Sequence, residues 1–421
     1  MDHLFSKYLR RHPAFTSFDV LQIKESGLIV VIPVYLEDSI RATLDSLRSC
    51  NKIDCHVSVI LVINAAAGSS EKVLSLQLQT IRELNEFAGK NNTSSLSFYV
   101  VEALELPQKH FGAGLARKIG MDLAVQHFYN AENQEGIIAS LDADTLVDKN
   151  YFEEIRQWFG ASQKNNACSI YYEHPVDGDE YAVEIYDAIT QYELHLRYYV
   201  ESLRSIGFPY AYHTVGSCFA FTANAYVRAG GMNRRQGGEE FYFIQKLIQL
   251  GGYGELNSTT IKPSSRISDR VPFGTGPSVK QIVDGQGEYL TYNPTAFFDL
   301  KELFLNADKY YKIDKEVYHE EILKLPGAVR SFLLNSDFWE ELNHLYNNCT
   351  TADVFKKRFY HIFNAFKVVK YLNYVHEHFI EKTTAFDAAI ELLQRLGVDT
   401  ADYFDEKELL LKYREMQKLH H

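Results

Sequence analysis

The first third of the chain alternates apolar runs with stretches of helical period, and this alternation limits the possible folds most strongly. Four runs rich in β-branched residues are the predicted strands: 28–35, 57–63, 96–104 and 136–142. The stretches between them have apolar side chains at helical spacing: 38–49, 71–88 and 112–129. Continuous apolar runs are typical of strands buried on both faces of a parallel sheet. Strands that alternate with helices predict a layered α/β domain.

The later sequence is less regular. We expect a long helix over 179–205, a strand-like segment over 217–223, a helix over 238–250 and a loop over 272–279. Residues 296–418 contain no convincing strand and predict several helices, with Ser336 and Thr351 as N-caps. The pattern predicts three regions, listed in chain order: a lead-in over 1–26, an α/β domain over 27–290 and a helical region over 291–421.

Charge and cysteine content limit the partners and the compartment. The chain has 43 Lys and Arg against 55 Asp and Glu, a net charge of −12, which argues against a general nucleic-acid binder. No run approaches the roughly 18 apolar residues that cross a bilayer, and residues 1–18 lack the apolar core of a signal peptide. The 5 cysteines are scattered without a C-x-x-C pair. We therefore expect a cytoplasmic protein without a disulfide framework or a cysteine zinc site.

Two aspartates follow the fourth predicted strand in the motif SLDADT. Asp142 and Asp144 are spaced so that both carboxylates can reach one hard cation, Mg²⁺ or Mn²⁺, which could also hold a substrate diphosphate. A D-x-D pair also arises by chance, and Asp177 and Asp179 have the same spacing in a polar stretch without a preceding strand. We expect that second pair to lie in a loop or to cap a helix.

Three further motifs carry groups that could act on an anion or a proton. Gly112 and Gly114 open a predicted helix with Arg117 in its first turns, which suits an anion, although helix–sheet packing alone could require the glycines. Glu239 and Glu240 begin another helix. One could be a general base and the other could orient it, or both could simply favour the helix N-terminus.

Arg266 and Arg270, in the stretch SSRISDRVPFGTG, could cover a phosphate group, and Asp269 could instead complete a metal site. A plain surface pair between arginine and aspartate is the alternative, and such pairs contribute little to stability.

The chain resembles a family 2 glycosyltransferase with the GT-A fold through five motifs that stand in the family's order: VVIPVYLED, VILVINAAAGSS, GAGLARKIG, SLDADT and GGMNRRQGGEEFYF. They cover residues 28–250, and RISDRVPFGTG extends the likeness to a bacterial-type subgroup through about 276. The resemblance implies a nucleotide-diphospho-sugar transferase fold with a helical carboxyl-terminal extension. It also implies transfer of a sugar from a nucleotide-sugar donor to the hydroxyl of a carbohydrate or another acceptor.

The resemblance also assigns roles to individual residues. Pro33 and Tyr35 would lie where the first strand meets the nucleotide, and Asp142 and Asp144 would hold a divalent cation that binds the donor diphosphate. Arg117 falls where the family places an arginine near the donor phosphates.

Gly114, Arg266 and Arg270 are further candidates for the donor site. Glu240 takes the place of the family's catalytic base, which predicts inversion at the anomeric carbon, and Glu239 matches the preceding acid.

Two positions depart from the family pattern. Asn64, followed by alanines, replaces the acidic pair that usually recognises the base, so the identity of the base stays open. Glu240 is one methylene longer than the usual aspartate. Three alternatives remain: a retaining GT-A transferase, a sugar nucleotidyltransferase and a non-catalytic nucleotide-sugar-binding relative.

A basic, aromatic segment lies in the carboxyl-terminal region. Residues 354–372 contain five cations and no acid: Lys356, Lys357, Arg358, Lys367 and Lys370. Phenylalanines lie between them. The segment could contact anionic lipid at the inner membrane face, but a helix whose aromatic face packs on the catalytic domain and whose basic face is solvated is the favoured interpretation.

Overall fold

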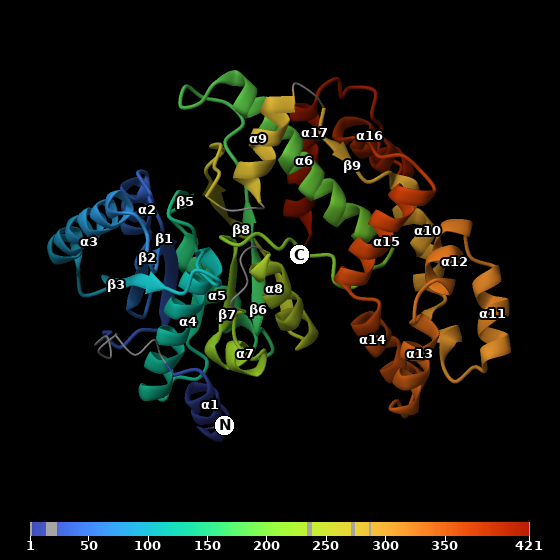
Figure 1. Ribbon diagram of the computed structural model, residues 1–421, viewed down its shortest axis with the longest axis horizontal. Helices are drawn as coiled ribbons and strands as arrows, with labels where there is room; N and C mark the ends of the chain where they lie inside the picture. The colour runs from blue at the N-terminus through green and yellow to red at the C-terminus, as the bar shows by residue number, and fades with distance from the viewer. Residues whose placement is uncertain (1, 14–22, 234–237, 271–273, 286–287, 421) are drawn as a thin grey trace. The chain divides into compact units, whose positions relative to one another are not determined.

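The structure, a computed structural model, describes residues 2–13, 23–233, 238–270, 274–285 and 288–420 (Figure 1). The chain divides into two compact units. Unit 1 comprises residues 1–186, 214–281 and 417–421, and unit 2 comprises residues 187–213 and 282–416. The catalytic motifs predicted from the sequence all lie in unit 1.

Unit 1 is built on an eight-stranded sheet in the order β3-β2-β1-β4-β7-β6-β8-β5. Its strands are β1 (Leu28–Val34), β2 (Val57–Ala66), β3 (Leu96–Leu106), β4 (Ile137–Ser140), β5 (Thr145–Val147), β6 (Ala167–Tyr172), β7 (Phe219–Thr222) and β8 (Tyr253–Pro263). The pairs β1–β2, β2–β3, β1–β4 and β6–β8 are parallel, whereas β4–β7, β6–β7 and β5–β8 are antiparallel. The predicted α/β fold with a mostly parallel sheet is confirmed.

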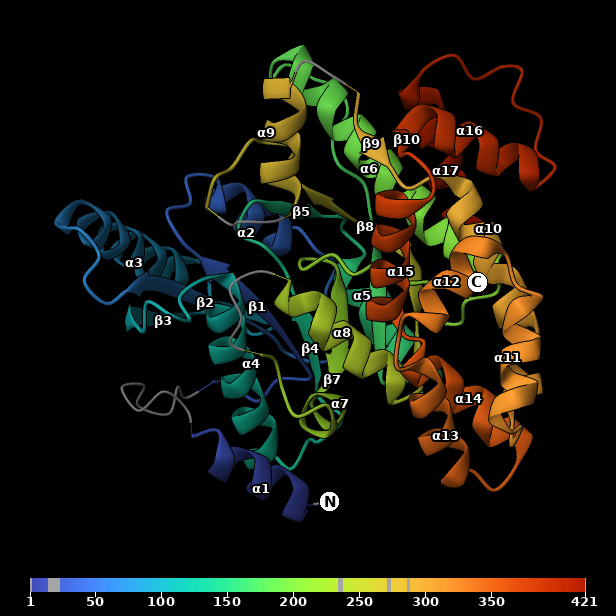
Figure 2. The same ribbon diagram turned by 45° about the vertical axis from the view of Figure 1, so that its right-hand side comes forward.

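The helices of unit 1 cover both faces of the parallel strands. They are α1 (Asp2–Arg11), α2 (Ile40–Arg48), α3 (Glu71–Asn91), α4 (Ala113–Asn130), α5 (Tyr151–Ala161), α7 (Ala223–Arg228), α8 (Glu239–Gln249) and α9 (Thr275–Gly285). Helix α3 packs on β2 and β3, and α4 packs on β1 and β2 from the opposite face (Figure 2). The close approach of α4 requires Gly120, because a Cβ atom there would lie 2.4 Å from Cγ1 of Val31.

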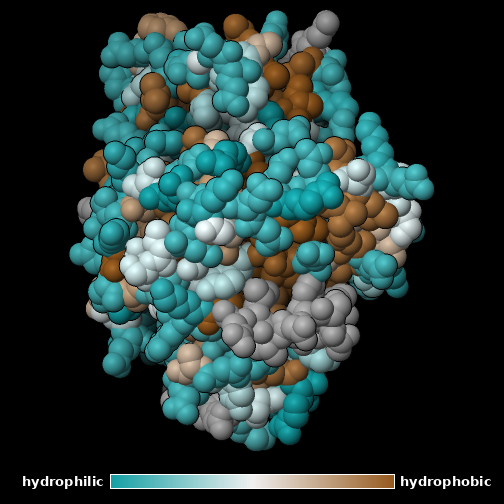
Figure 3. All heavy atoms as spheres, turned by 90° about the vertical axis from the view of Figure 1, so that its left-hand side faces the viewer, coloured by the Kyte–Doolittle hydropathy of each residue, from teal (hydrophilic) through white to brown (hydrophobic). Residues whose placement is uncertain are grey.

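The amphipathic pattern of α3 corresponds to the side of the helix that is buried. Its buried side chains include Ile81, Leu84 and Phe87, spaced three residues apart, and these face the sheet. Figure 3 views unit 1 from the side of α3, and hydrophilic side chains cover most of this face. The helical period of residues 71–88 is thus that of a helix with one buried side.

Unit 2 is helical apart from one short ladder. Its helices are the second part of α6 (Val183–Ser205), α10 (Pro294–Leu305), the 3₁₀ helix η1 (Ala307–Tyr310), α11 (Lys315–Leu323), α12 (Gly327–Leu334), α13 (Phe338–Asn347), α14 (Ala352–Ile362), α15 (Ala365–His378), α16 (Ala385–Arg395) and most of α17 (Glu406–Leu419). Strand β9 (Leu290–Thr291) pairs antiparallel with β10 (Thr383–Thr384). The predicted absence of strands is therefore wrong at residues 383–384.

Three local predictions can be compared with the observed elements. Thr351 caps α14, since its side chain accepts a hydrogen bond from the Val354 amide. Ser336 does not cap a helix, because Asp337 occupies the N-cap position of α13. The predicted loop over 272–279 is wrong from Thr275 onward, where α9 begins, while residues 271–273 lie outside the described part of the chain.

The basic segment forms two helices, α14 and α15, rather than one. Phe355, Phe359 and Phe363 are fully buried, and Phe359 and Phe363 both stack edge-on against Phe338 of α13. The aromatic face thus packs inside unit 2, on a neighbouring helix of the carboxyl-terminal region. Lys356 is among the exposed residues on the other side of α14. Among the described residues, no helix has the length and apolar character needed to cross a membrane.

Candidate active site

Two clusters of arginine and carboxylate side chains lie beyond the carboxyl ends of β1 and β4. The Arg117 cluster consists of Arg117, Asp142 and Glu239. The Glu37 cluster consists of Glu37, Asp144, Arg266 and Arg270. The two aspartates of SLDADT therefore belong to different clusters. Parallel strands place their carboxyl ends at one edge of a sheet, which is where α/β domains usually bind ligands.

The Arg117 cluster joins three elements of unit 1. Arg117 Nη2 donates to Asp142 Oδ1 at 2.5 Å, and Nη1 donates to Glu239 Oε1 at 2.9 Å. The side chains of Arg117 and Glu239 are 6% and 3% exposed, whereas Asp142 is 35% exposed. Gly216 leaves room for the guanidinium, since a Cβ atom there would lie 2.9 Å from Nη2. One buried cation thus links the first turn of α4 to the D-x-D motif and to the start of α8.

Opposing effects act on the pKa of Arg117. Burial alone would lower it, but the Asp142 and Glu239 carboxylates outweigh burial and hold the pKa above its ordinary value. Arg117 therefore stays charged and neutralises two acids. Negative charge at the start of a helix is favourable by itself. That effect does not require the ion pair that Glu239 of α8 forms with Arg117 of α4.

The Glu37 cluster connects the turn after β1 to residues 266–270. The two oxygens of Glu37 accept from Nη1 and Nη2 of Arg266 at 2.7 and 2.5 Å. Arg270 donates to Glu37 at 2.8 Å and to the carbonyls of Tyr35 and Leu36 at 2.9 and 3.0 Å. Arg266 also lies 2.5 Å from Oδ2 of Asp144. Two cations thus meet two acids in a bidentate arrangement typical of arginine.

Two carboxyl groups have raised pKa values: Glu240, next to Glu239, and Asp144 of the Glu37 cluster. Burial and the adjacent Glu239 charge raise the pKa of Glu240 to about 7, against the opposing effect of Arg117. Burial raises the pKa of Asp144 to about 6, although Arg266 works in the other direction. Groups that titrate near neutral pH within a charged site are candidates for proton transfer.

A metal ion fits the two aspartates in chemical type. Each offers hard oxygen ligands, and each is contacted by its arginine through one carboxylate oxygen, which leaves the other available. Within the described residues, no group of three or more His, Cys, Asp or Glu side chains is placed to hold a metal. Asp269, considered as a further ligand, instead pairs with exposed Lys280 at 2.7 Å.

The other predicted donor-site residues lie near these clusters to different degrees. The Tyr35 carbonyl accepts from Arg270, while its ring packs edge-on against Phe111 at 5.0 Å. Gly114 is buried in the first turn of α4. Pro33 is buried within β1, in register with Val62 of β2.

Asn64 is buried as well. At 1% exposure it donates its amide hydrogens to the carbonyls of Val34 and Val62. The structure therefore does not bring Asn64 into either cluster, and its role in base recognition stays a prediction.

Sequence reasoning missed three residues that organise the site. Glu37 was visible as an acid just after an apolar strand, in the same kind of position as Asp142. Gly216 gave no signal, because its role depends on a guanidinium from α4. Gln77 looked like a polar residue within α3, yet it is fully buried.

Gln77 holds the turn that presents Glu37. Its side-chain amide donates to the Asn64 carbonyl at 2.7 Å, and Oε1 accepts from the Leu36 amide at 3.2 Å. Leu36 has a φ of 47°, which is unusual for a residue with a branched side chain. The Gln77 hydrogen bond stabilises this turn at the edge of the site.

Replacing Gln77 by leucine should therefore destabilise the protein by about 2–4 kcal/mol, because it leaves the Leu36 amide and the Asn64 carbonyl unpaired. Urea denaturation followed by circular dichroism would measure the loss. The matched control is Gln79→Leu, on the exposed side of the same helix, which should change stability by less than about 0.5 kcal/mol. Equal stability of the two variants would contradict this role of Gln77.

Comparisons with known proteins find one family match and several distant structural likenesses. Residues 137–282 match the family described as glycosyl transferase family group 2. TarS of S. aureus, solved with UDP-GlcNAc, is similar at 12% identity over 80% of this chain and 92% of that chain, with a TM-score of 0.40. The mannosyltransferase PcManGT from Pyrobaculum calidifontis, solved with GDP-Man and Mn²⁺, is similar at 14% identity over 100% and 93%, with a TM-score of 0.34.

GalNAc-T7, solved with UDP, GalNAc and Mn²⁺, is similar at 13% identity over 80% of this chain and 57% of that chain, with a TM-score of 0.35. These likenesses are too distant to transfer a substrate or a metal. The chain has no match among curated proteins. The matched family region contains Asp142, Asp144, Glu240 and Arg266, together with the strands that position them. The part of the chain from β4 into α9 is therefore similar to glycosyl transferase family group 2.

Proposed function

We propose that this protein is a metal-dependent glycosyltransferase that inverts the anomeric configuration, with Glu240 as the general base. The observation that carries the proposal is the pKa of Glu240, which burial and Glu239 raise to about 7. A base is most effective when its pKa lies near the working pH, because it is then partly free of its proton yet still basic. The neighbouring Glu239 has a different role, since its carboxylate is held by Arg117.

In this mechanism, Glu240 accepts the proton of the acceptor hydroxyl as that oxygen attacks the anomeric carbon. Arg117 bonds the Glu239 carboxylate, and the Glu239 charge helps to raise the pKa of Glu240. Direct attack by the deprotonated hydroxyl with departure of the nucleoside diphosphate gives inversion. The alternative with retention would need a different arrangement, in which Glu240 does not receive the acceptor proton.

Asp142 and Asp144 would hold the divalent cation, each through the oxygen that its arginine leaves available. A bound Mg²⁺ or Mn²⁺ would neutralise charge on the departing diphosphate. Arg266 and Arg270 add guanidinium groups at the same edge of the sheet, suited to phosphate oxygens. In the structure these two arginines are held by Glu37, so the site keeps its cations in place by internal ion pairs.

The donor assignment can be tested by thermal shift with a panel of nucleoside diphosphates, including UDP and GDP, with and without Mn²⁺. We expect one diphosphate to raise the melting temperature only when the metal is present, because a ligand that binds the folded state stabilises it. Asp142→Ala should abolish this metal-dependent shift. An unchanged shift in Asp142→Ala would overturn the metal assignment. A search of nucleotide sugars for slow donor hydrolysis would then identify the sugar.

The pH dependence of the reaction offers a further prediction. Only the deprotonated form of Glu240 can accept a proton, so kcat/KM should rise with pH and level off above an apparent pKa of about 7. Below this pH the rate should fall about tenfold for each pH unit. Initial rates between pH 5 and 9 at saturating metal would show the profile. A rate that is flat between pH 6 and 8 would contradict the assignment of Glu240 as the base.

A further inference from the structure

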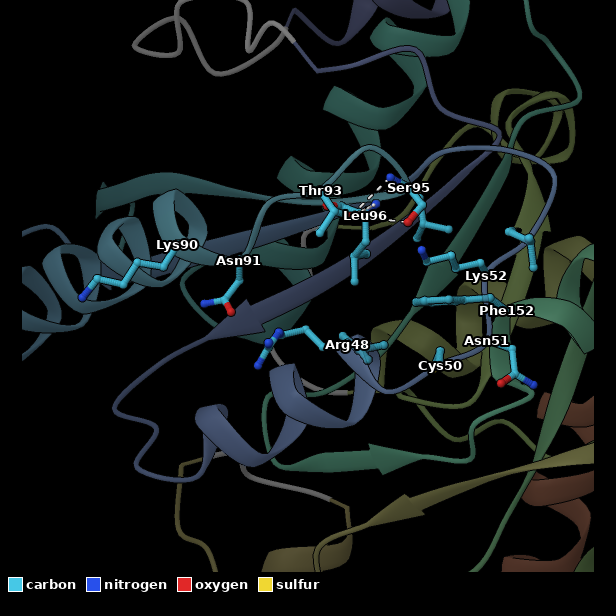
Figure 4. A pocket seen from close by; sticks show the side chains of 13 residues that line it. Arg48, Cys50, Asn51, Lys52, Lys90, Asn91, Thr93, Ser95, Leu96 and Phe152 are labelled. Atoms are coloured by element: carbon cyan, nitrogen blue, oxygen red, sulfur yellow. Dashed lines mark hydrogen bonds between the residues drawn. The ribbon is translucent and has the colours of Figure 1, made fainter.

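Unit 1 contains a hollow of about 240 Å³ that lies away from both arginine–carboxylate clusters (Figure 4). It borders Val57 and Leu96, the first residues of the parallel strands β2 and β3. The catalytic motifs follow the opposite, carboxyl ends of the strands. We call this hollow the amino-edge pocket, and its position separates it from the predicted donor site.

The charged side chains that line the amino-edge pocket are all cations. Arg48, Lys52 and Lys90 line it, and no Asp or Glu does. In a chain with a net charge of −12, a pocket lined by cations alone is unexpected. Asn51, Asn91, Thr93 and Ser95 also line it, with amide and hydroxyl groups that already bond Glu153, the Phe87 carbonyl and each other. This set of groups is suited to a phosphate or a similar anion.

The floor of the amino-edge pocket is apolar. Ile53 and Leu96 line it and are partly exposed, together with the buried side chains of Leu47, Val57 and Phe152. Figure 4 shows Phe152 and Leu96 extending toward the hollow between the polar side chains. Apolar surface at the base of a pocket stabilises an apolar part of a ligand. A bare inorganic ion would leave this surface without a partner.

The cations are available for a ligand. Arg48 pairs with Asp45 at 2.8 Å, and the two side chains are 41% and 44% exposed, so the pair is weak and can rearrange. Lys52 forms no ion pair within the described residues, and its ammonium lies on the side of Ser95 in Figure 4. Lys90 pairs with Glu86 at 3.7 Å, and these two side chains are 77% and 74% exposed, so this pair is weak as well.

We propose that the amino-edge pocket binds an organic phosphomonoester, with the phosphate on Arg48 and Lys52 and the organic group on the apolar floor. The volume fits a phosphate attached to a group about the size of one ring, since pockets for larger ligands are typically about 300–1,000 Å³. The pocket lies at the opposite edge of the sheet from the catalytic motifs, so this ligand binds independently of the nucleotide-sugar donor.

Isothermal titration calorimetry with phenyl phosphate tests the proposal on the full chain at low salt. Phenyl phosphate should bind about tenfold more tightly than inorganic phosphate, because its ring contacts the apolar floor. Phenol, which lacks the charge, should show no measurable binding. Inorganic phosphate binding as tightly as phenyl phosphate would overturn the assignment to an organic monoester, and so would equal binding of phenol.

Two matched double variants locate the site. Arg48→Gln with Lys52→Gln should weaken phenyl phosphate binding at least about tenfold, because each removes a charged hydrogen-bond donor. The control variant, Arg41→Gln with Lys72→Gln, also removes two positive charges, one from α2 and one from α3, but both lie outside the pocket. Arg41 is a close control, since it also pairs with Asp45 and lies over the Phe87 ring, as Arg48 does.

The control pair should bind phenyl phosphate as the unaltered protein does. Equal weakening in both double variants would show a general effect of charge and would overturn the site. Arg270→Gln should also leave the binding unchanged. If Arg270→Gln abolished the binding while the Arg48 and Lys52 variant retained it, phenyl phosphate would occupy the catalytic edge, and the proposal would be wrong. All variants replace residues that are at least partly exposed, and circular dichroism would confirm that each is folded.

Discussion

Replacing Glu240 by glutamine should lower kcat by about 10²–10⁴-fold, because the amide cannot accept the acceptor proton. The side chain keeps its size and its place in the first turn of α8, so donor binding and stability should change little. Burial raises the pKa of Glu240 to about 7, and a neutral amide suits the same environment. The measurement is steady-state turnover at saturating donor and metal, together with donor affinity by thermal shift.

Two companion variants sharpen this test. Glu240→Asp keeps a carboxylate but shortens the side chain by one methylene, so it should retain more activity than Glu240→Gln, with a loss that reports on positioning. Glu105→Gln removes an exposed carboxylate from β3 and should leave turnover unchanged. Near-normal turnover of Glu240→Gln with normal donor binding would show that the proton goes elsewhere, and the proposed base would have to be abandoned.

Replacing Arg117 by glutamine should destabilise unit 1 by about 3–5 kcal/mol. Removal of one partner from a buried ion pair leaves the other charge uncompensated, and this costs more than loss of an exposed pair. Arg117 bonds two acids, of which Glu239 is 3% exposed. Urea denaturation at pH 7 would measure the effect. The control is Arg156→Gln, whose pair with Asp54 has side-chain exposures of 44% and 70% and should contribute at most about 1 kcal/mol.

The pH dependence of the Arg117 variant separates charge from packing. Without the guanidinium, the pKa of Glu240 should rise further, because Arg117 otherwise opposes the effects of burial and of Glu239 on this carboxyl group. The folded variant then binds the proton of Glu240 more tightly than the unfolded variant does. The variant should therefore regain stability relative to the unaltered protein as the pH falls from 7 toward 4. A stability difference that stays constant over this range would point to lost packing. A loss below about 1 kcal/mol at pH 7 would show that the ion pairs do not hold the cluster together.

Much of the fold of unit 1 could be predicted from local sequence. The strands β1 and β2 are buried on both faces. Their sequences are therefore continuous apolar runs, which can be recognised without the structure. The stripe of α3 carries an equally clear helical period. The motif SLDADT was also readable, since two acids just after a buried strand are unusual. The short strand β10 was missed because two residues carry no period, and the start of α9 was missed because Gly276 and Pro277 indicated a loop.

The pairing of charges could not be predicted in the same way. Arg117 and Glu239 are separated by 122 positions, and Arg266 and Glu37 by 229. The sequence shows that each is charged but not which opposite charge it meets. Asn64 illustrates the same limit, because its position after β2 suggested contact with a base, whereas its amide hydrogens are used by backbone carbonyls of β1 and β2.

The sequence by itself determined strands β1 to β4 and β7, several of the helices and the residue types at the candidate site, because period and burial are properties of neighbouring residues, whereas β5, β6 and β8 were not predicted. Only the tertiary structure decided that the two aspartates of one motif belong to separate arginine clusters, and that Glu37 and Gln77 shape the edge of the site. The physical reason is that ion pairs and buried hydrogen bonds depend on distance in space. The order of strands in the sheet sets that distance, and local patterns do not record it.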